Sequence, residues 1–193
     1  MRRVRYGVGM SLNGFIADGQ GGTDFLVHDP TYDPAPFFAS IDTVLMGRLT
    51  YEVALRHGMR AYDGLHNYVV SRTLHAGEYP EVTLIRDDVE ARVAALRRAP
   101  GKDIWLCGGG VLLASLLAAG LVDTVELGVS PTLLTRPGTP VLASEAIDAR
   151  LRLPASLALT LTHHRALPSG VIVLEYDVRR GAGREASPSA RSA

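Results

Sequence analysis

Apolar residues follow two periodicities that alternate along the chain. Short apolar runs such as residues 5–10 (RYGVGM) and 42–47 (DTVLMG) are typical of strands buried within a sheet. Residues 48–58 and 87–101 show helical spacing, and each stretch ends in a glycine. Strands that alternate with helices predict parallel pairs, whereas the strand-like runs on either side of residues 168–170 (PSG) predict an antiparallel hairpin. We therefore expect a three-layer α/β/α sandwich with a mostly parallel mixed sheet and an antiparallel C-terminal edge.

The length favours one domain. The chain has 193 residues, of which 47% are hydrophobic, and this is enough for one sizeable core. The pattern of strands and helices occupies residues 1–180, which we predict to be that domain. Residues 181–193 are small, polar and rich in glycine and serine, and they are expected to form a disordered tail.

Composition narrows the possible partners. The 20 basic and 20 acidic side chains cancel, which argues against a broad surface for nucleic acid or anionic membrane. The N-terminus lacks the features of a signal peptide, and no apolar run reaches the roughly 18 residues that a membrane span needs, so we expect a cytoplasmic protein. Cys107 is the only cysteine, and His163 and His164 point to opposite faces of a predicted strand. We therefore predict no metal site and a small-molecule partner.

Residues 106–114 (LCGGGVLLA) place three glycines between a predicted strand and a predicted helix. Such a turn points backbone N–H groups and the positive end of the helix dipole at one spot, which suits a pyrophosphate. The triplet matches neither common phosphate fingerprint, because Leu113 occupies the third glycine position of G-x-G-x-x-G and no Gly-Lys-Ser/Thr follows. A tight turn that packs closely without a ligand is the alternative.

A second segment, residues 46–52 (MGRLTYE), also follows a strand and opens a helix. Gly47 lets a ligand approach the backbone, Arg48 offers a forked cation and Thr50 offers a hydroxyl. Ordinary capping with a solvated arginine is the alternative for this segment.

A third segment, residues 69–74 (VVSRTL), places Ser71, Arg72 and Thr73 at the end of a strand. This cluster suits a phosphate monoester such as the 2′-phosphate of an NADP-type cofactor, with a simple polar strand end as the alternative. All three segments should meet at the carboxyl edge of the sheet, where open α/β sheets bind ligands. Two pyrophosphate sites and one extra phosphate site fit NADPH better than ATP or a sugar phosphate.

The order of these segments resembles the dihydrofolate reductase superfamily, specifically the C-terminal reductase domain of the bifunctional riboflavin-biosynthesis deaminase/reductase. The matching stretches are SLNGFIAD, MGRLTYE, VVSRTL and IWLCGGGVLLASLLAAGLVDTVELGVSPTLL, within a region from Val4 to about Arg179. The resemblance implies a dihydrofolate reductase-like fold, a homodimer and an NADPH-dependent reductase of the 5-amino-6-(5-phosphoribosylamino)uracil reductase type.

The resemblance also implies which residues bind the cofactor. The glycine turn and the Gly-Arg-x-Thr segment would line the pyrophosphate, the Ser-Arg-Thr segment would receive the 2′-phosphate, and the backbone after the first strand would meet the nicotinamide. The expected cofactor-binding residues are Ile16, Ala17, Gly47, Arg48, Thr50, Ser71, Arg72, Thr73, Gly108, Gly109, Gly110, Val111 and Leu112.

Two features depart from the family pattern. The loop Leu133–Leu142 reads LLTRPGTPVL, where relatives commonly read Leu-Leu-Gly-x-Gly-x-Pro-Leu-Phe, so Thr135 replaces a glycine and Pro137 is inserted. This loop lies near the active site in relatives. Dihydrofolate reductases also place an acid on the helix after the first loop, near a tryptophan, and nothing around Trp105 matches it. We therefore do not expect folate as the substrate.

Reduction of a C=N or C=O group needs a proton as well as a hydride. We predict that Asp24 supplies it, because Phe25 and Leu26 beside it would wall off a substrate pocket. A turn role for Asp24 is the alternative, and Tyr51 is a further candidate donor. The other candidates are Asp18, Asp29 and Asp33.

The sequence thus predicts an NADPH-dependent reductase that transfers a hydride to a small heterocyclic or carbonyl/imine substrate. A protein of another class, a non-catalytic NADP(H)-binding sensor or structural dimer, is the alternative.

Overall fold

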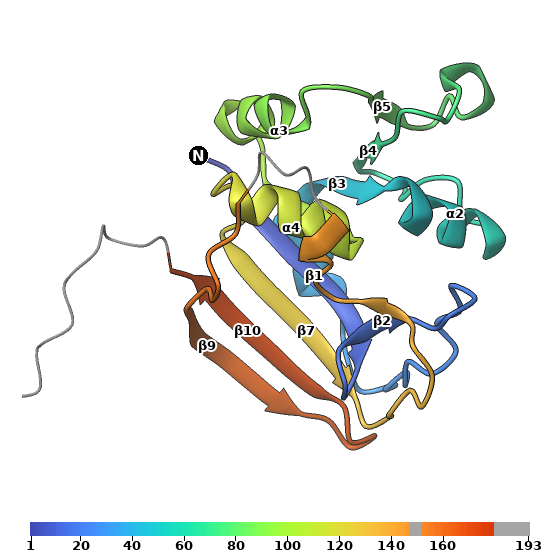
Figure 1. Cartoon of the computed structure of the whole chain (residues 1–193), viewed down its shortest axis with the longest axis vertical. Coiled ribbons are helices and arrows are strands. Elements are labelled where there is room, and N and C mark those ends of the chain that lie inside the picture. The colour runs from blue at the N-terminus through green and yellow to red at the C-terminus, as the bar shows by residue number, and fades with distance from the viewer. Residues whose placement is uncertain (147–151, 180–193) are drawn as a thin grey trace, which may run out of the picture.

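One eight-stranded sheet forms the centre of the molecule, in the order β5-β4-β3-β6-β1-β7-β10-β9 (Figure 1). The structure is a computed structural model that describes residues 1–146 and 152–179; the predicted tail, residues 181–193, lies outside them. Strands β5 to β7 in this order run parallel to their neighbours, whereas β10 is antiparallel to both β7 and β9. The strands are β1 (Val4–Ser11), β3 (Ile41–Gly47), β4 (His66–Val70), β5 (Thr83–Ile85), β6 (Asp103–Gly108), β7 (Thr124–Ser130), β9 (Leu159–Ala166) and β10 (Ile172–Val178).

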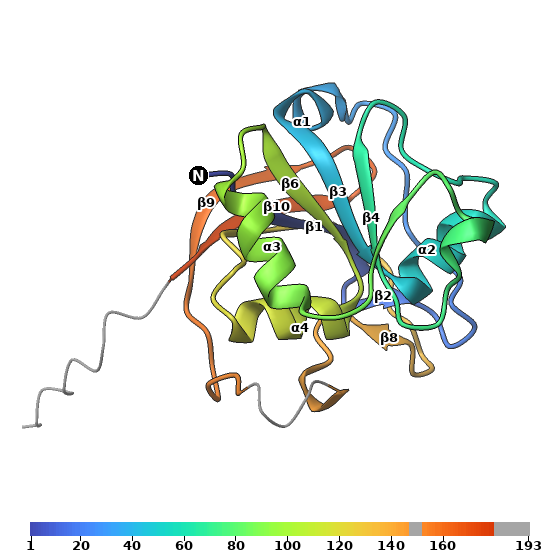
Figure 2. The same cartoon turned by 90° about the horizontal axis from the view of Figure 1, so that it is seen from above.

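Helices cover both faces of the sheet. Helices α3 (Val89–Arg98) and α4 (Gly110–Ala118) lie on one face and α1 (Ala35–Ser40) lies on the other (Figure 2). Helix α2 (Arg48–Arg56) packs on the same face as α1, since its Tyr51 is buried in a cluster with Met46. The predicted three-layer sandwich, its mostly parallel sheet and its antiparallel C-terminal edge are therefore confirmed.

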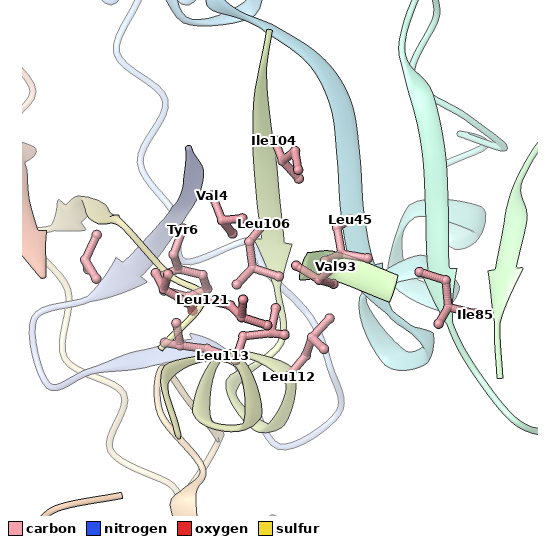
Figure 3. Packing of buried hydrophobic residues seen from close by; sticks show 13 residues of the cluster. Val4, Tyr6, Leu45, Ile85, Val93, Ile104, Leu106, Leu112, Leu113 and Leu121 are labelled. Atoms are coloured by element: carbon pink, nitrogen blue, oxygen red, sulfur yellow. The ribbon is translucent and has the colours of Figure 1, made fainter. Parts of the chain in front are cut away.

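The main core lies between the sheet and helix α4. Val4, Tyr6 and Leu106 point from β1 and β6 toward Leu112 and Leu113 of α4, and all five are buried (Figure 3). Residues that alternate with them along β1 point to the other face, where Arg5 and two glycines stand in place of large apolar side chains. The two faces of the sheet thus differ: one holds the core and the other is open near its centre.

Two short strands form a separate sheet that the apolar pattern did not predict. Strand β2 (Phe15–Ala17) pairs antiparallel with β8 (Thr139–Pro140). This pairing brings the loop after β1 against the loop Leu133–Leu142. The Asn13 side chain donates to the Leu134 carbonyl oxygen at 2.9 Å and accepts from the Leu134 N–H at 3.1 Å. The two loops are therefore joined side by side at the carboxyl end of β1. Two short 3₁₀ turns, Ala76–Glu78 and Ser144–Ala146, complete the described elements.

Candidate functional site

The three predicted phosphate segments follow adjacent strands. Ser71 follows β4, Gly47 ends β3 and Gly108 ends β6, and these strands are neighbours in the order β4-β3-β6-β1. Since the strands are parallel, their carboxyl ends share one edge of the sheet. Ile16 lies just beyond β1, the next strand along. The prediction that these segments meet at one edge is therefore confirmed.

The segments at β3 and β6 form one cradle. A Cβ atom built on Gly47 would lie 3.7 Å from the backbone nitrogen of Gly109, and Cβ atoms built on Gly108 and Gly109 would each lie 3.5 Å from Oγ1 of Thr50. The peptide between Gly108 and Gly109 is cis. Neither α2 nor α4 is capped by the side chain of its N-cap residue, which is glycine in both helices. Two sets of first-turn N–H groups thus face a shared space without a side chain to fill it.

The third glycine of the triplet is also closely packed. A Cβ atom on Gly110 would lie 2.5 Å from the Pro140 carbonyl oxygen and 3.1 Å from the Ala143 backbone nitrogen. Gly110 is therefore required where the chain of residues 140–143 crosses the start of α4. Val111 is exposed, whereas the Leu112 side chain is buried in the core, so only the Leu112 backbone can face a ligand at this edge.

Arg48 stands at the rim of the cradle. Its guanidinium lies 2.5 Å from a carboxylate oxygen of Glu52, one turn later in α2, and both side chains are partly exposed. An exposed pair of this kind contributes little to stability. The guanidinium can therefore turn toward a phosphate at little cost.

The Ser71-Arg72-Thr73 segment forms a compact turn. Ser71 is buried, and its hydroxyl accepts hydrogen bonds from the backbone N–H groups of Thr73 at 3.2 Å and Leu74 at 3.0 Å. Arg72 and Thr73 are exposed. The serine thus shapes the turn, while the arginine and threonine remain available to a ligand.

Arg86, at the end of β5, is part of this region, and the sequence analysis did not identify it. Its guanidinium donates to the carbonyl oxygens of Arg72 at 3.0 Å and Leu74 at 2.5 Å. Arg86 therefore holds the turn in place and adds a second positive charge near Arg72. Its place directly after β5, the strand beside β4, could have identified Arg86 from the sequence.

The segment after β1 lies beside the cradle. The side chain of Ile16 comes within 4.0 Å of a Cβ atom built on Gly109. A side chain at Gly138 would collide with the carbonyl oxygen of Ala17, so the loop Leu133–Leu142 packs directly on this segment. The expected nicotinamide-facing residues, Ile16 and Ala17, are thus placed next to the predicted pyrophosphate residues.

A cavity of about 380 Å³ opens on the α1 face of the sheet. Gly7, Gly9 and Gly128 form its floor, and the aromatic rings of Phe37, Phe38 and Trp105 line one side. These three rings meet edge to face, with centroids 5.5 to 5.7 Å apart. The floor was not predicted from the sequence, although Gly7 and Gly9, two residues apart in a strand, lie on the same face of it.

The polar groups of the cavity are mainly carboxylates. Asp29, Glu126 and Glu175 all line it, together with the phenol of Tyr32. Arg5 is held to both carboxylate oxygens of Glu126, at 2.7 and 2.8 Å. Burial, and then the negative charges of Glu126 and Glu175, raise the pKa of Tyr32 above its usual value. The phenol and the two glutamates therefore converge on one region.

Asp29, one of the carboxylates that line the cavity, has a structural role. Its carboxylate is buried and accepts hydrogen bonds from the Ser169 N–H at 2.9 Å and from the Thr31 N–H and hydroxyl at 2.8 and 2.6 Å. Hydrogen bonds from Ser169 and then Thr31 hold the pKa of Asp29 well below its usual range. The ionised Asp29 carboxylate thus links the segment before α1 to the β9–β10 hairpin. Because it stays ionised, it is a poor proton donor.

We expect Asp29→Asn to lower the midpoint of thermal unfolding at pH 7 by several degrees. Because the pKa is lowered in the folded state, the stabilisation from Asp29 is present above its unfolded pKa of about 4 and is lost as the pH falls below it. The variant should therefore lose less stability than the wild type on acidification. Thermal unfolding followed between neutral and acidic pH measures both effects. Asp87→Asn, on an exposed bend, is the matched control. An equal effect of both substitutions would contradict the stabilising role of Asp29.

The predicted proton donors are placed differently from one another. Asp24 is exposed and is not among the residues that line the cavity, whereas its neighbour Leu26 does line it. Asp18 accepts hydrogen bonds from the N–H groups of Gly22 and Gln20, which lower its pKa. The Tyr51 hydroxyl donates to the Arg60 carbonyl oxygen inside the second core cluster. Asp33 accepts from the Ala35 N–H at the start of α1.

Comparison with known proteins bears on this arrangement. A protein-family model described as the RibD C-terminal domain matches residues 2–173. The chain belongs to the RibD C-terminal domain family. The chain is 30% identical over 187 residues to the uncharacterized protein YyaP of Bacillus subtilis, covering 91% of this chain and 94% of YyaP.

Solved structures show the same fold at lower identity. A diaminohydroxyphosphoribosylaminopyrimidine deaminase/5-amino-6-(5-phosphoribosylamino)uracil reductase from Thermotoga maritima matches with a TM-score of 0.66 at 14% identity, covering 92% of this chain and 57% of that chain. A dihydrofolate reductase from Enterococcus faecalis, complexed with NADP(H), matches with a TM-score of 0.62 at 16% identity, covering 92% of this chain and 97% of that chain. The RibD C-terminal domain described above therefore has the fold of dihydrofolate reductase, as its sequence resemblance implied.

The described residues offer neither a cluster of metal ligands nor a membrane-spanning helix. Within residues 1–146 and 152–179, no group of three or more His, Cys, Asp and Glu side chains is arranged to hold a metal ion. In the same part of the chain, no helix has both the length and the apolar character needed to cross a membrane.

Proposed function

We propose that this protein is an NADPH-dependent reductase of a small heterocyclic, carbonyl or imine compound. The observation that carries the proposal is the order of the polar segments along the sheet edge. Ser71, Gly47 and Gly108 follow three adjacent strands, and Ile16 lies beyond the fourth. An extended dinucleotide presents its 2′-phosphate, pyrophosphate and nicotinamide in the same order. The reductase activities named for the structural relatives support the same reading.

Each predicted cofactor residue then has a role. The 2′-phosphate would bind Arg72 and Thr73 on the turn that Ser71 shapes, with Arg86 close by. The pyrophosphate would lie in the cradle of the two helix N-termini, within reach of Arg48 and Thr50. The remaining contacts are backbone contacts by Ile16, Ala17, Gly47, Gly108, Gly109, Gly110, Val111 and Leu112.

The substrate would occupy the glycine-floored cavity. NADPH supplies a hydride when bound, and the protein's part is to orient the acceptor and to deliver a proton. The groups of this chain that face the cavity, Tyr32, Glu126 and Glu175, or a water that they hold, fit that second task. Asp24 stays a prediction without such a position. We also propose that the protein is a cytoplasmic homodimer.

Titration with NADPH and NADH tests the cofactor assignment. Trp105 is the only tryptophan and lines the cavity, so bound NADPH should quench its emission. Arg72→Ala is expected to weaken NADPH binding by about tenfold or more, because it removes a charge-assisted hydrogen bond to the 2′-phosphate. Binding of NADH should not change. Arg92→Ala, at an exposed position on α3, is the matched control.

Other results would redirect the proposal. An equal loss of NADPH and NADH affinity would contradict the 2′-phosphate role of Arg72. No response of the wild type to NADPH would contradict the cofactor itself. Binding of NADPH without turnover of any imine, pterin or carbonyl compound in a panel would favour the alternative, a non-catalytic NADP(H)-binding protein.

A further inference from the structure

We propose that the cavity selects a flat heterocycle that carries a cationic or N–H-rich edge and no phosphate. This inference rests on the proposed function, since it names the class of compound that would accept the hydride. It differs from the phosphoribosyl substrate implied by the family resemblance. Two features of the cavity lead to it: open floor backbone at Gly128, and carboxylates that outnumber the cations beside it.

The floor favours a flat ring. Gly7 and Gly9 stand two residues apart on the same face of β1, and Gly9 pairs directly with Gly128 on β7. Residues two apart on a strand are separated by about 7 Å and neighbouring strands by about 5 Å. The Trp105 ring covers Gly7 and the Leu26 side chain covers Gly9, so Gly128 is the floor position that leaves bare backbone, and the space between these side chains and β10 suits a flat ring.

A Cβ atom on the floor would meet different neighbours at each glycine. On Gly7 it would lie 3.2 Å from the Trp105 ring nitrogen, and on Gly9 it would lie 3.1 Å from the Leu26 side chain. On Gly128 its only close neighbour would be the Gly9 Cα, at 3.9 Å. Space for a ligand is thus concentrated above Gly128, between the aromatic wall and strand β10.

Two carboxylates and one guanidinium lie next to this space. Glu126 and Glu175 pair directly across β7 and β10, so their side chains emerge side by side on the cavity face. Arg5 binds the Glu126 carboxylate through two hydrogen bonds. Among the described residues, Glu175 has no side-chain hydrogen bond or ion pair, although it lies within electrostatic range of Arg5 and Tyr32. One guanidinium therefore faces two adjacent carboxylates, and a ligand cation would complete the balance.

No lysine or arginine lines the cavity within residues 1–146 and 152–179. The nearest basic residues on β9 are His163, paired with Glu175, and Arg165, paired with Val173. Both are exposed and neither lines the cavity. His28 does line it, but it is exposed at the rim. A substrate phosphate placed here would face Glu126 and Glu175, while the neighbouring Arg5 guanidinium is already held by two hydrogen bonds to Glu126, so binding of a second anion is unfavourable.

Three ligands that share one ring system test the inference. 2-Aminoquinoline presents an amidine-like N–H edge, quinoline presents none, and quinoline-2-carboxylate presents an anion. Quenching of Trp105 in the full-length protein without NADPH, with calorimetry as a second readout, reports their binding. We expect 2-aminoquinoline to bind about tenfold or more tightly than quinoline, as one charge-assisted hydrogen bond predicts, and the carboxylate to bind most weakly.

Glu175→Gln connects this preference to one side chain. The variant should weaken 2-aminoquinoline about tenfold and leave quinoline unchanged, because glutamine keeps the shape and removes the charge. Glu78→Gln, on the exposed 3₁₀ turn Ala76–Glu78, is the matched control and should change neither affinity. Should the Glu175 variant fail to fold, the comparison of the three ligands on the wild type remains decisive.

Several results would overturn the inference. These are equal or tighter binding of the carboxylate, no quenching by any of the three compounds up to their solubility limits, and an unchanged affinity of Glu175→Gln for 2-aminoquinoline. NADPH titration of the same samples separates this proposal from the proposed function. Retained NADPH binding without the ligand preference rejects the substrate class alone, whereas the preference without NADPH binding rejects the reductase.

Discussion

Gly47→Val is expected to abolish NADPH binding in a protein that still folds. The backbone at Gly47 is extended, with φ −79° and ψ 162°, which valine also adopts. Its Cβ atom would lie 3.7 Å from the Gly109 nitrogen and 3.8 Å from the Gly108 carbonyl oxygen, which are ordinary contact distances. The added side chain therefore fits the folded chain but fills the space between the N-termini of α2 and α4.

The size of the effect follows from what the pyrophosphate would lose. Charge-assisted hydrogen bonds contribute about 1.5–3 kcal/mol each, so losing two of them weakens binding by about a hundredfold or more. The free energy of unfolding should fall by about 1 kcal/mol, because glycine is favoured over valine at the N-cap position but is not required there. Fluorescence titration with NADPH and thermal unfolding measure the two quantities.

Gly77→Val is the matched control for this change. Gly77 lies in an exposed 3₁₀ turn, and a Cβ atom there would meet no other atom within 4 Å. NADPH affinity should therefore equal that of the wild type. Undiminished NADPH binding by Gly47→Val would mean that the pyrophosphate lies elsewhere. It would contradict the proposed course of the cofactor along the sheet edge.

The position of the cradle could be predicted from the sequence because it depends on local order. Residues 46–52, 69–74 and 106–114 each follow an apolar run, and parallel strands bring such ends to one edge. The order of the strands was not needed for that inference. The close packing at Gly110 could not be predicted, because it depends on the carbonyl oxygen of Pro140, which lies in a separate loop far along the chain.

The cavity could not be predicted for a related reason. Its floor combines Gly9 with Gly128, and this pair exists only through the register of β1 against β7, strands more than a hundred residues apart. Glu126 and Glu175 come from β7 and β10, whereas the acids considered as proton donors all lie in the segment after the first strand. Glu126 and Glu175 become neighbours through the β7–β10 pairing. Local spacing carries no information about such pairs.

Gly128→Val is expected to close the cavity without disturbing the cofactor. A Cβ atom at this position would have only the Gly9 Cα within 4 Å, at 3.9 Å, so the valine methyl groups would extend into the space above the floor. Valine suits a strand, and stability should be unchanged or slightly higher. A steric block of this kind costs a substrate about 1–3 kcal/mol, or roughly ten- to two-hundredfold in turnover. NADPH binding should stay at the wild-type level, because the cradle lies at the ends of β3 and β6.

Two further substitutions, Gly128→Ala and Gly7→Val, test the expectation for Gly128→Val. Gly128→Ala adds one carbon in open space and should reduce quinoline binding and turnover less than valine does. Gly7→Val is a different case, because its Cβ atom would press on the Trp105 ring nitrogen that donates to the Gly7 carbonyl oxygen at 2.8 Å, so it should destabilise the protein. NADPH oxidation with any compound that the wild type reduces, and Trp105 quenching by quinoline, measure the outcome. If Gly128→Val retained full turnover and full quinoline binding, the reacting compound would have to lie outside this cavity, and the carboxylates of β7 and β10 would lose their place in its recognition.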